Sequence, residues 1–141
     1  MTMKTYHGSC HCKAVRFEVD LDLAAKGTNR CNCSICWKAR SWFAIAGASE
    51  LRLLAGESRL GSYQWVPEGK TDSFLDYRFC MRCGVRAYAE GDLPQLGGKF
   101  YAVHVPTLDD ASRDELAAAP LKFNDMLHDD PDHTPDDIRL L

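Results

Sequence analysis

The chain has 141 residues and a net charge of −3, with 45% hydrophobic and 26% charged residues, the balance of an ordinary globular protein. Residues 109–141 hold ten acidic and three basic side chains, which leaves +4 for the first 108 residues. A surplus of four is too small for a nucleic-acid-binding surface, which needs clustered Lys and Arg.

The length favours a single domain, residues 1–141, with a core that needs no disulfides to fold. No stretch approaches the ~18 apolar residues of a membrane span. The start has no apolar run of ~7–15 residues, so a secretory signal is not expected. We therefore expect a cytoplasmic protein, in which clustered thiols stay reduced and more often bind metal than form disulfides.

In chain order, the first predicted strand is residues 13–19 (KAVRFEV), where apolar and polar residues alternate. Further strands are predicted at residues 42–47, 51–56, 60–66, 73–80 and 99–105. Glycine and proline separate them as turns. Because no amphipathic helix intervenes, the pattern favours an all-β, or mostly β, fold over βαβ units.

One helix is predicted, within residues 109–119 (DDASRDELAAA). Ser112 can cap its start, Glu115 follows three residues later as in a capping box, and Pro120 ends it. After Pro120 the chain is acidic and interrupted by proline, so we expect it to follow the surface without regular structure.

The seven cysteines fall into three groups, and none is isolated. They are Cys10 and Cys12, then Cys31, Cys33 and Cys36, then Cys80 and Cys83. Scattered core thiols would not group in this way, so the pattern favours metal binding.

Cys80 and Cys83 form a C-x-x-C turn, which lets two thiolates reach one tetrahedral ion at ~2.3 Å. Gly84 follows directly and permits a positive φ. Cys10 and Cys12 can supply the other pair, because residues i and i+2 of a strand face the same side. These four thiols would close a structural zinc site, with no position left for a substrate.

Cys31, Cys33 and Cys36 remain, and three ligands with an open fourth position are typical of a catalytic zinc. Such a zinc favours a further soft ligand, such as a substrate thiol, and would lower its pKa. Lys38 and Arg40 follow at once and are candidates to hold a substrate carboxylate. Asn32 and Ser34 alternate with the thiols as candidate hydrogen-bond partners of sulfur or substrate.

Three alternatives stay open for this second group. One of the five histidines could complete the shell and make the site structural. Cys33 and Cys36 could form a redox disulfide. An iron–sulfur centre is a third option, although it calls for a fourth cysteine.

The segments YHGSCHCKAVRFEV, CNCSIC and YRFCMRCGVRAY resemble the family of glutathione-dependent formaldehyde-activating enzyme and centromere protein V. The resemblance extends from about Tyr6 to Leu141. It implies an all-β, Mss4-like β-tent fold with a short C-terminal helix. It also implies two zinc ions per chain, divided as above between the four-cysteine and three-cysteine groups.

The activity implied by this resemblance is formation of S-hydroxymethylglutathione from formaldehyde and glutathione, a carbon–sulfur lyase chemistry. We expect a zinc enzyme for thiol–aldehyde adducts whose partners are glutathione or a similar thiol and an aldehyde, with no nucleic acid or membrane. Two rival hypotheses are a non-catalytic zinc-stabilised binding module and a thiol redox or metal-storage protein. The sequence does not indicate an oligomeric state.

Overall fold

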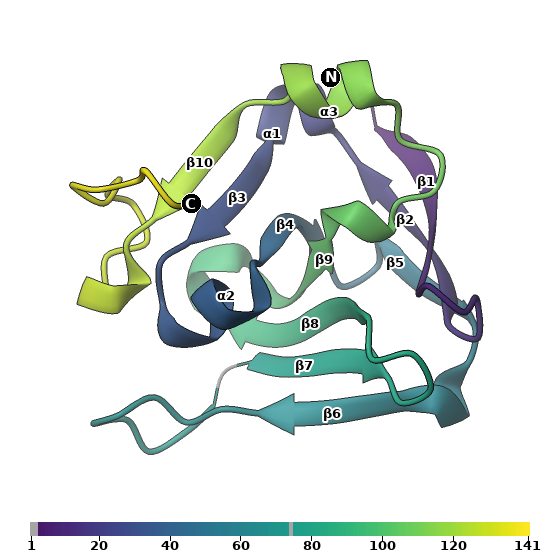
Figure 1. Cartoon of the computed structure of the whole chain (residues 1–141), viewed down its shortest axis with the longest axis horizontal. Coiled ribbons are helices and arrows are strands. Elements are labelled where there is room, and N and C mark those ends of the chain that lie inside the picture. The colour runs from purple at the N-terminus through teal and green to yellow at the C-terminus, as the bar shows by residue number, and fades with distance from the viewer. Residues whose placement is uncertain (1–2, 74) are drawn as a thin grey trace.

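The computed structural model describes residues 3–73 and 75–141 and contains two β-sheets (Figure 1). The smaller sheet is antiparallel, in the order β1 (Lys4–Ser9), β2 (Arg16–Leu21), β5 (Leu51–Ala55). The larger has seven strands, in the order β10 (Leu121–Asn124), β3 (Thr28–Cys31), β4 (Trp42–Gly47), β9 (Gly98–His104), β8 (Arg86–Leu93), β7 (Leu75–Cys80), β6 (Leu60–Gln64).

The helices are short. They are α1 (Leu23–Lys26), α2 (Ser34–Ala39), α3 (Arg113–Ala118) and the 3-10 turns η1 (Glu57–Arg59), η2 (Pro94–Leu96), η3 (Val105–Thr107) and η4 (Met126–His128). In Figure 1, β1, β2 and β5 slope down one side, β3 and β10 slope down the other, and β6 to β8 cross the base. Within the described chain, no helix has the length and apolar character needed to cross a bilayer.

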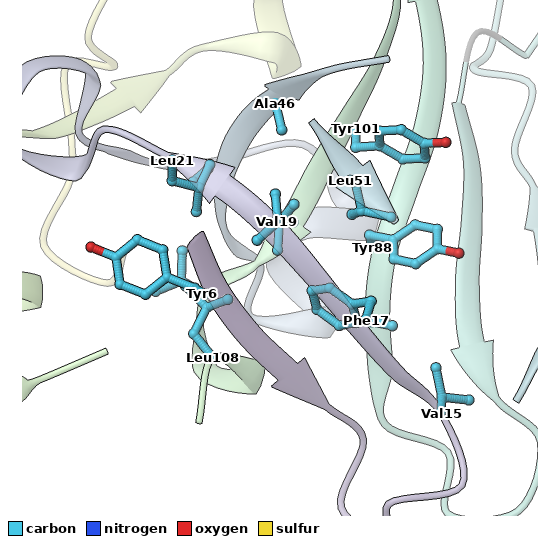
Figure 2. Packing of buried hydrophobic residues seen from close by; sticks show 14 of the residues in the cluster. Tyr6, Val15, Phe17, Val19, Leu21, Ala46, Leu51, Tyr88, Tyr101 and Leu108 are labelled. Carbon is cyan, nitrogen blue, oxygen red and sulfur yellow. The ribbon is translucent and has the colours of Figure 1, made fainter. Parts of the chain in front are cut away.

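The core lies between the two sheets and follows from the alternation of β2. Phe17, Val19 and Leu21 are buried, while Glu18 between them turns outward. Figure 2 shows Phe17 directed at Tyr88, and the two rings meet edge-on with centroids 5.8 Å apart. Gly8 lies under this ring, where a Cβ atom would come within 2.4 Å of Phe17. Glycine is therefore needed at position 8.

The all-β prediction is confirmed, and the six predicted strands correspond to β2, β4, β5, β6, β7 and β9. Residue 74, at the start of one of them, lies outside the described residues. The predicted helix is α3, and its capping box is present, because Ser112 accepts from the Glu115 N–H and Glu115 accepts from the Ser112 N–H.

Two sequence expectations were wrong or incomplete. The chain after Pro120 does form regular structure, since β10 pairs in parallel with β3 along its whole length. Strands β1, β3 and β8 and helices α1 and α2 were not predicted. Two of these additional elements, β3 and α2, carry the three-cysteine group.

Candidate metal centres

The four-cysteine group is assembled as the sequence predicts. The sulfur atoms of Cys10, Cys12, Cys80 and Cys83 all lie within 4.8 Å of one another, and all four thiols are free. The Cys12 sulfur is 3.7 Å from both the Cys10 and the Cys80 sulfurs. Four sulfurs placed tetrahedrally at ~2.3 Å from an ion would be ~3.8 Å apart. The donor set therefore fits a tetrahedral ion such as zinc.

The convergence of Cys10 and Cys12 has a different cause from the one expected. The two residues lie in the turn that follows β1, not in the strand itself. The Lys13 N–H donates to the Cys10 carbonyl at 3.1 Å, and Lys13 adopts a positive φ of 68°. The turn, and not the pleat of a strand, brings the two sulfurs together.

The C-x-x-C turn closes where β7 ends. Gly84 has the predicted positive φ, 79°, and its N–H donates to the Cys80 carbonyl at 2.7 Å. The N–H groups of Arg82 and Cys83 point at the Cys80 sulfur, at 3.3 and 3.5 Å. Backbone N–H groups, of Cys12 first and then of Val85, lower the pKa of Cys83 to about 6. The backbone thus favours thiolates, the form that binds metal.

The three-cysteine group is buried and compact. Cys31 ends β3, Cys33 is the N-cap of α2 and Cys36 lies inside α2, with all three sulfurs within 4.8 Å of one another. Hydrogen bonds from Cys31, then from Cys36, lower the pKa of Cys33 to about 3. Hydrogen bonds with Cys31 and Cys33 raise the pKa of Cys36. Cys33 is therefore the first of the three thiols to lose its proton.

The surroundings of this group are mainly apolar on one side. Ile35, Phe43, Trp65 and Met126 pack against the three thiols. Within residues 3–73 and 75–141, no histidine or carboxylate joins the three sulfurs as a fourth ligand. This arrangement agrees with a site that keeps one position open.

Asn32, a candidate from the sequence to hydrogen-bond sulfur or substrate, makes its hydrogen bonds with the C-terminal segment. Its amide nitrogen donates to Asp125 at 2.7 Å, and its amide oxygen accepts from the Leu127 N–H at 3.0 Å. Its backbone N–H donates to the Asn124 carbonyl at 3.3 Å. Asn32 therefore fastens the three-cysteine loop to β10 and η4.

A small pocket opens beside the group, with a volume of about 10 Å³. Its lining residues are Arg30, Cys31, Cys36, Trp37, Arg40 and Ser41, with Leu141 over them. Arg40, one of the two predicted substrate residues, is thus at the pocket, where it stacks on Trp37 and donates to the Leu140 carbonyl at 2.7 Å. The other, Lys38, is exposed on α2 and is not part of the lining.

Arg86 is a site residue that the sequence analysis missed. It donates to the Ser41 hydroxyl at 2.9 Å, and its guanidinium lies 4.3 Å from the centre of the Tyr77 ring. Burial lowers its pKa, while the acidic groups of Tyr77, Cys36 and Cys33 oppose that effect. On the neighbouring β9, burial, the charge of Arg86 and the charge of Arg30 lower the pKa of His104 to about 4. His104 is therefore a neutral imidazole at pH 7.

Comparisons with known proteins agree with this geometry. The family model of glutathione-dependent formaldehyde-activating enzymes matches residues 5–123. A Halomonas elongata protein, provisionally named a glutathione-dependent formaldehyde-activating enzyme, is 32% identical over 130 residues, which are 89% of this chain and 76% of the relative. A crystal structure of a Rhodobacter sphaeroides protein matches with a TM-score of 0.66 at 27% identity, over 84% of this chain and 99% of that one. The chain belongs to the family of glutathione-dependent formaldehyde-activating enzymes.

Proposed function

We propose that the protein is a zinc-dependent enzyme for adducts of a thiol and an aldehyde, with glutathione and formaldehyde as the model pair and carbon–sulfur lyase chemistry as the reaction type. The observation that carries this proposal is that the two cysteine groups offer different numbers of metal ligands. One offers four sulfurs, the other three, and three protein ligands are what catalytic zinc sites usually provide.

In this proposal each of the two groups holds one zinc ion. Cys10, Cys12, Cys80 and Cys83 form the structural site, which joins the turn after β1 to the end of β7. The second ion belongs to the three-cysteine group. When bound there, it would supply Lewis acidity that favours the thiolate form of a substrate thiol.

The chain's own residues would hold and surround the substrate. Phe43 and Trp65 keep water from the apolar side of the three-cysteine group. On the polar side, Arg40 lies at the pocket and can reach a substrate carboxylate once its contact with Leu140 is released. Lys38, exposed on the same helix, is the second candidate for this contact.

The test is the zinc content per chain of carefully prepared protein, with and without glutathione, followed by turnover with formaldehyde. We expect one tightly held ion and a second whose occupancy responds to glutathione, together with formation of S-hydroxymethylglutathione. Two zinc ions whose occupancy does not change with glutathione, in a protein without turnover, would contradict the proposal.

The small pocket favours a second candidate, a non-catalytic zinc-stabilised binding module. A volume of about 10 Å³ has room for about one water molecule and not for a tripeptide. The two candidates separate in one experiment, because the module would hold both zinc ions and give no turnover with any thiol and aldehyde supplied.

A further inference from the structure

Four arginines of the described chain are half-buried, and they divide into two pairs. Arg52 contacts Glu18 and Asp20 at 2.7 and 2.9 Å, and Arg78 contacts Glu90 at 3.5 Å. For the other two, Arg30 and Arg86, no ion pair within 4.0 Å is present among the described residues. Burying a charge without a counter-ion costs free energy, so the positions of Arg30 and Arg86 need an explanation.

Both of these arginines border the three-cysteine group. Arg30 directly precedes Cys31 at the end of β3 and lines the pocket. It stacks over the Trp42 ring at 5.1 Å and lines the pocket together with Arg40. Repulsion between two like charges at one pocket adds to the cost of the arrangement.

Arg86 reaches the same place because of a bulge between β7 and β8. Tyr88 pairs with Arg78 but Arg86 pairs with Phe79, so Ala87 is an extra residue and the side chains switch faces there. Arg86 consequently lies on the side of Tyr77, beside the three-cysteine group, and not with Tyr88 in the core.

Ser41 connects Arg86 to the pocket. Its hydroxyl accepts from Arg86 at 2.9 Å, its N–H donates to the Cys36 carbonyl at 2.9 Å, and the residue lines the pocket. One hydroxyl satisfies one of the five N–H donors of a guanidinium. The others remain suited to a planar anion such as a carboxylate, which accepts two parallel hydrogen bonds.

The charge of the group itself does not account for the arginines. Three thiolates with one divalent ion would carry −1, whereas the half-buried Arg30 and Arg86 carry +2 and the exposed Arg40 adds a third positive charge. A bound carboxylate would bring the balance closer to neutrality. We infer that Arg30 and Arg40, which line the pocket with Ser41, and Arg86, which donates to the Ser41 hydroxyl, form the subsite that binds the carboxylate of the thiol substrate. This inference rests on the proposed function and assigns the residues that recognise its thiol.

The C-terminal residues cover this subsite in the present structure. The Leu140 carbonyl accepts from Arg40 at 2.7 Å, in the manner of the oxygen that a substrate carboxylate would offer, and Leu141 lies over the pocket. The ligand therefore replaces the Leu140 carbonyl on Arg40, and residues 140–141 shift to admit it.

The experiment compares glutathione with its diethyl ester, which keeps the thiol and lacks the carboxylate charges. Binding to the zinc-loaded protein is measured by calorimetry, and thiolate ligation is followed separately by the absorption of cobalt-substituted protein. Wild type should bind glutathione about tenfold more tightly than the ester, since charge-assisted hydrogen bonds are the stronger kind.

Arg86→Met should weaken glutathione binding about tenfold, leave ester binding unchanged and so abolish the discrimination. Arg86→Lys, which keeps the charge, should restore part of it and guards against a folding artefact. The matched control is Arg16→Met, at an exposed arginine on β2 of the other sheet, which should behave as wild type.

The outcomes separate this inference from the function on which it rests. Equal affinity for glutathione and its ester, with turnover intact, would contradict the carboxylate-binding subsite but not the proposed enzymatic function. Tighter binding of glutathione than of the ester, without any turnover, would contradict the enzymatic function and support the subsite. Absence of binding by both thiols would overturn both.

Discussion

The side-chain amide of Asn32 donates to the carboxylate of Asp125 at 2.7 Å and so joins the three-cysteine loop to a segment 93 residues further along the chain. Leu127 completes the connection with a backbone hydrogen bond to the same amide. The position of Cys31 and Cys33 on either side of Asn32 thus depends on the C-terminal segment. Groups that orient ligands in this way commonly affect metal affinity.

Replacing Asp125 with Ala should therefore weaken metal binding at the three-cysteine group about tenfold, the lower end of the range for residues that support metal ligands. The four-cysteine group should be unaffected. A chelator competition on both sites measures this effect. Asp132→Ala, an exposed acidic residue of the same segment, is the matched control. Equal affinities in the two variants would show that the Asn32 contact does not position the cysteines.

The two cysteine groups should respond differently to substitution. Cys33→Ala should abolish turnover and the glutathione-sensitive zinc while the protein stays folded, because this residue serves only the open site. Cys80→Ala should lose the other ion and unfold at a markedly lower temperature, because a structural metal contributes folding free energy. Zinc analysis and thermal unfolding by circular dichroism measure both effects. A Cys33→Ala protein with normal turnover would contradict the proposed mechanism.

The sequence was sufficient to divide the cysteines into a group of four and a group of three, because a ligand count and short spacings are local properties. The group of four thiols and the group of three can be distinguished without knowing how the chain folds. The position of Gly84 directly after Cys83 was enough to predict its positive φ. The strands with a clear alternation were also found, as in Phe17, Val19 and Leu21 of β2.

Arg40 of the arginine subsite was predicted from its place after the cysteines, but Arg30 and Arg86 could not be, because their placement depends on contacts that no local pattern encodes. Arg86 faces the site because Ala87 is bulged, and Arg30 packs against the ring of Trp42. The pairing of β10 with β3 joins residues more than ninety positions apart, as with Leu121 and Thr28. Strand β3 (TNRC) shows no apolar–polar alternation, and β10 (LKFN) alternates over only four residues, too few to predict a strand.

Gly84→Ala should destabilise the protein by about 1–2 kcal/mol, because alanine resists the positive φ of 79°. No other atom lies within 4 Å of the added Cβ, so the cost is one of backbone conformation alone. Gly69→Ala is a matched control, with φ 81° and equally open space in the loop between β6 and β7. Both should lower the free energy of unfolding in urea, but only Gly84→Ala should weaken zinc binding. Equal zinc affinity in the two would show that the C-x-x-C turn tolerates the change.

Ser112→Ala should cost about 1 kcal/mol, the usual value for losing an N-cap side chain. The capping box also predicts a pH effect at Glu115, whose pKa is lowered to about 2 by a hydrogen bond from Tyr6 and then by the Ser112 N–H. Because the folded-state pKa is depressed, this stabilisation is complete above the ordinary value of 4.5 and is lost as pH falls toward 2. Glu115→Gln should remove that part of the pH dependence, whereas Asp114→Asn, its exposed neighbour, should keep it. Identical urea-unfolding curves from pH 5 to pH 2 for wild type and Glu115→Gln would argue against the contact.

The free energy of unfolding should depend on pH through His104, which lies near Arg86 and Arg30. Its pKa is lowered from 6.5 to about 4 by burial first, then by the charges of Arg86 and Arg30. The unfolded chain therefore takes up a proton before the folded protein does, and stability falls as pH decreases from 6.5 to about 4, by at most about 3 kcal/mol. Arg86→Met removes one positive charge, so the His104 pKa should rise and part of this loss should disappear. Titration of the imidazole by NMR, alongside urea unfolding at pH 4 and pH 7, measures both quantities. An imidazole whose midpoint is unmoved in Arg86→Met would show that the Arg86 charge does not act on His104, and would remove one of the electrostatic links that place Arg86 at the site.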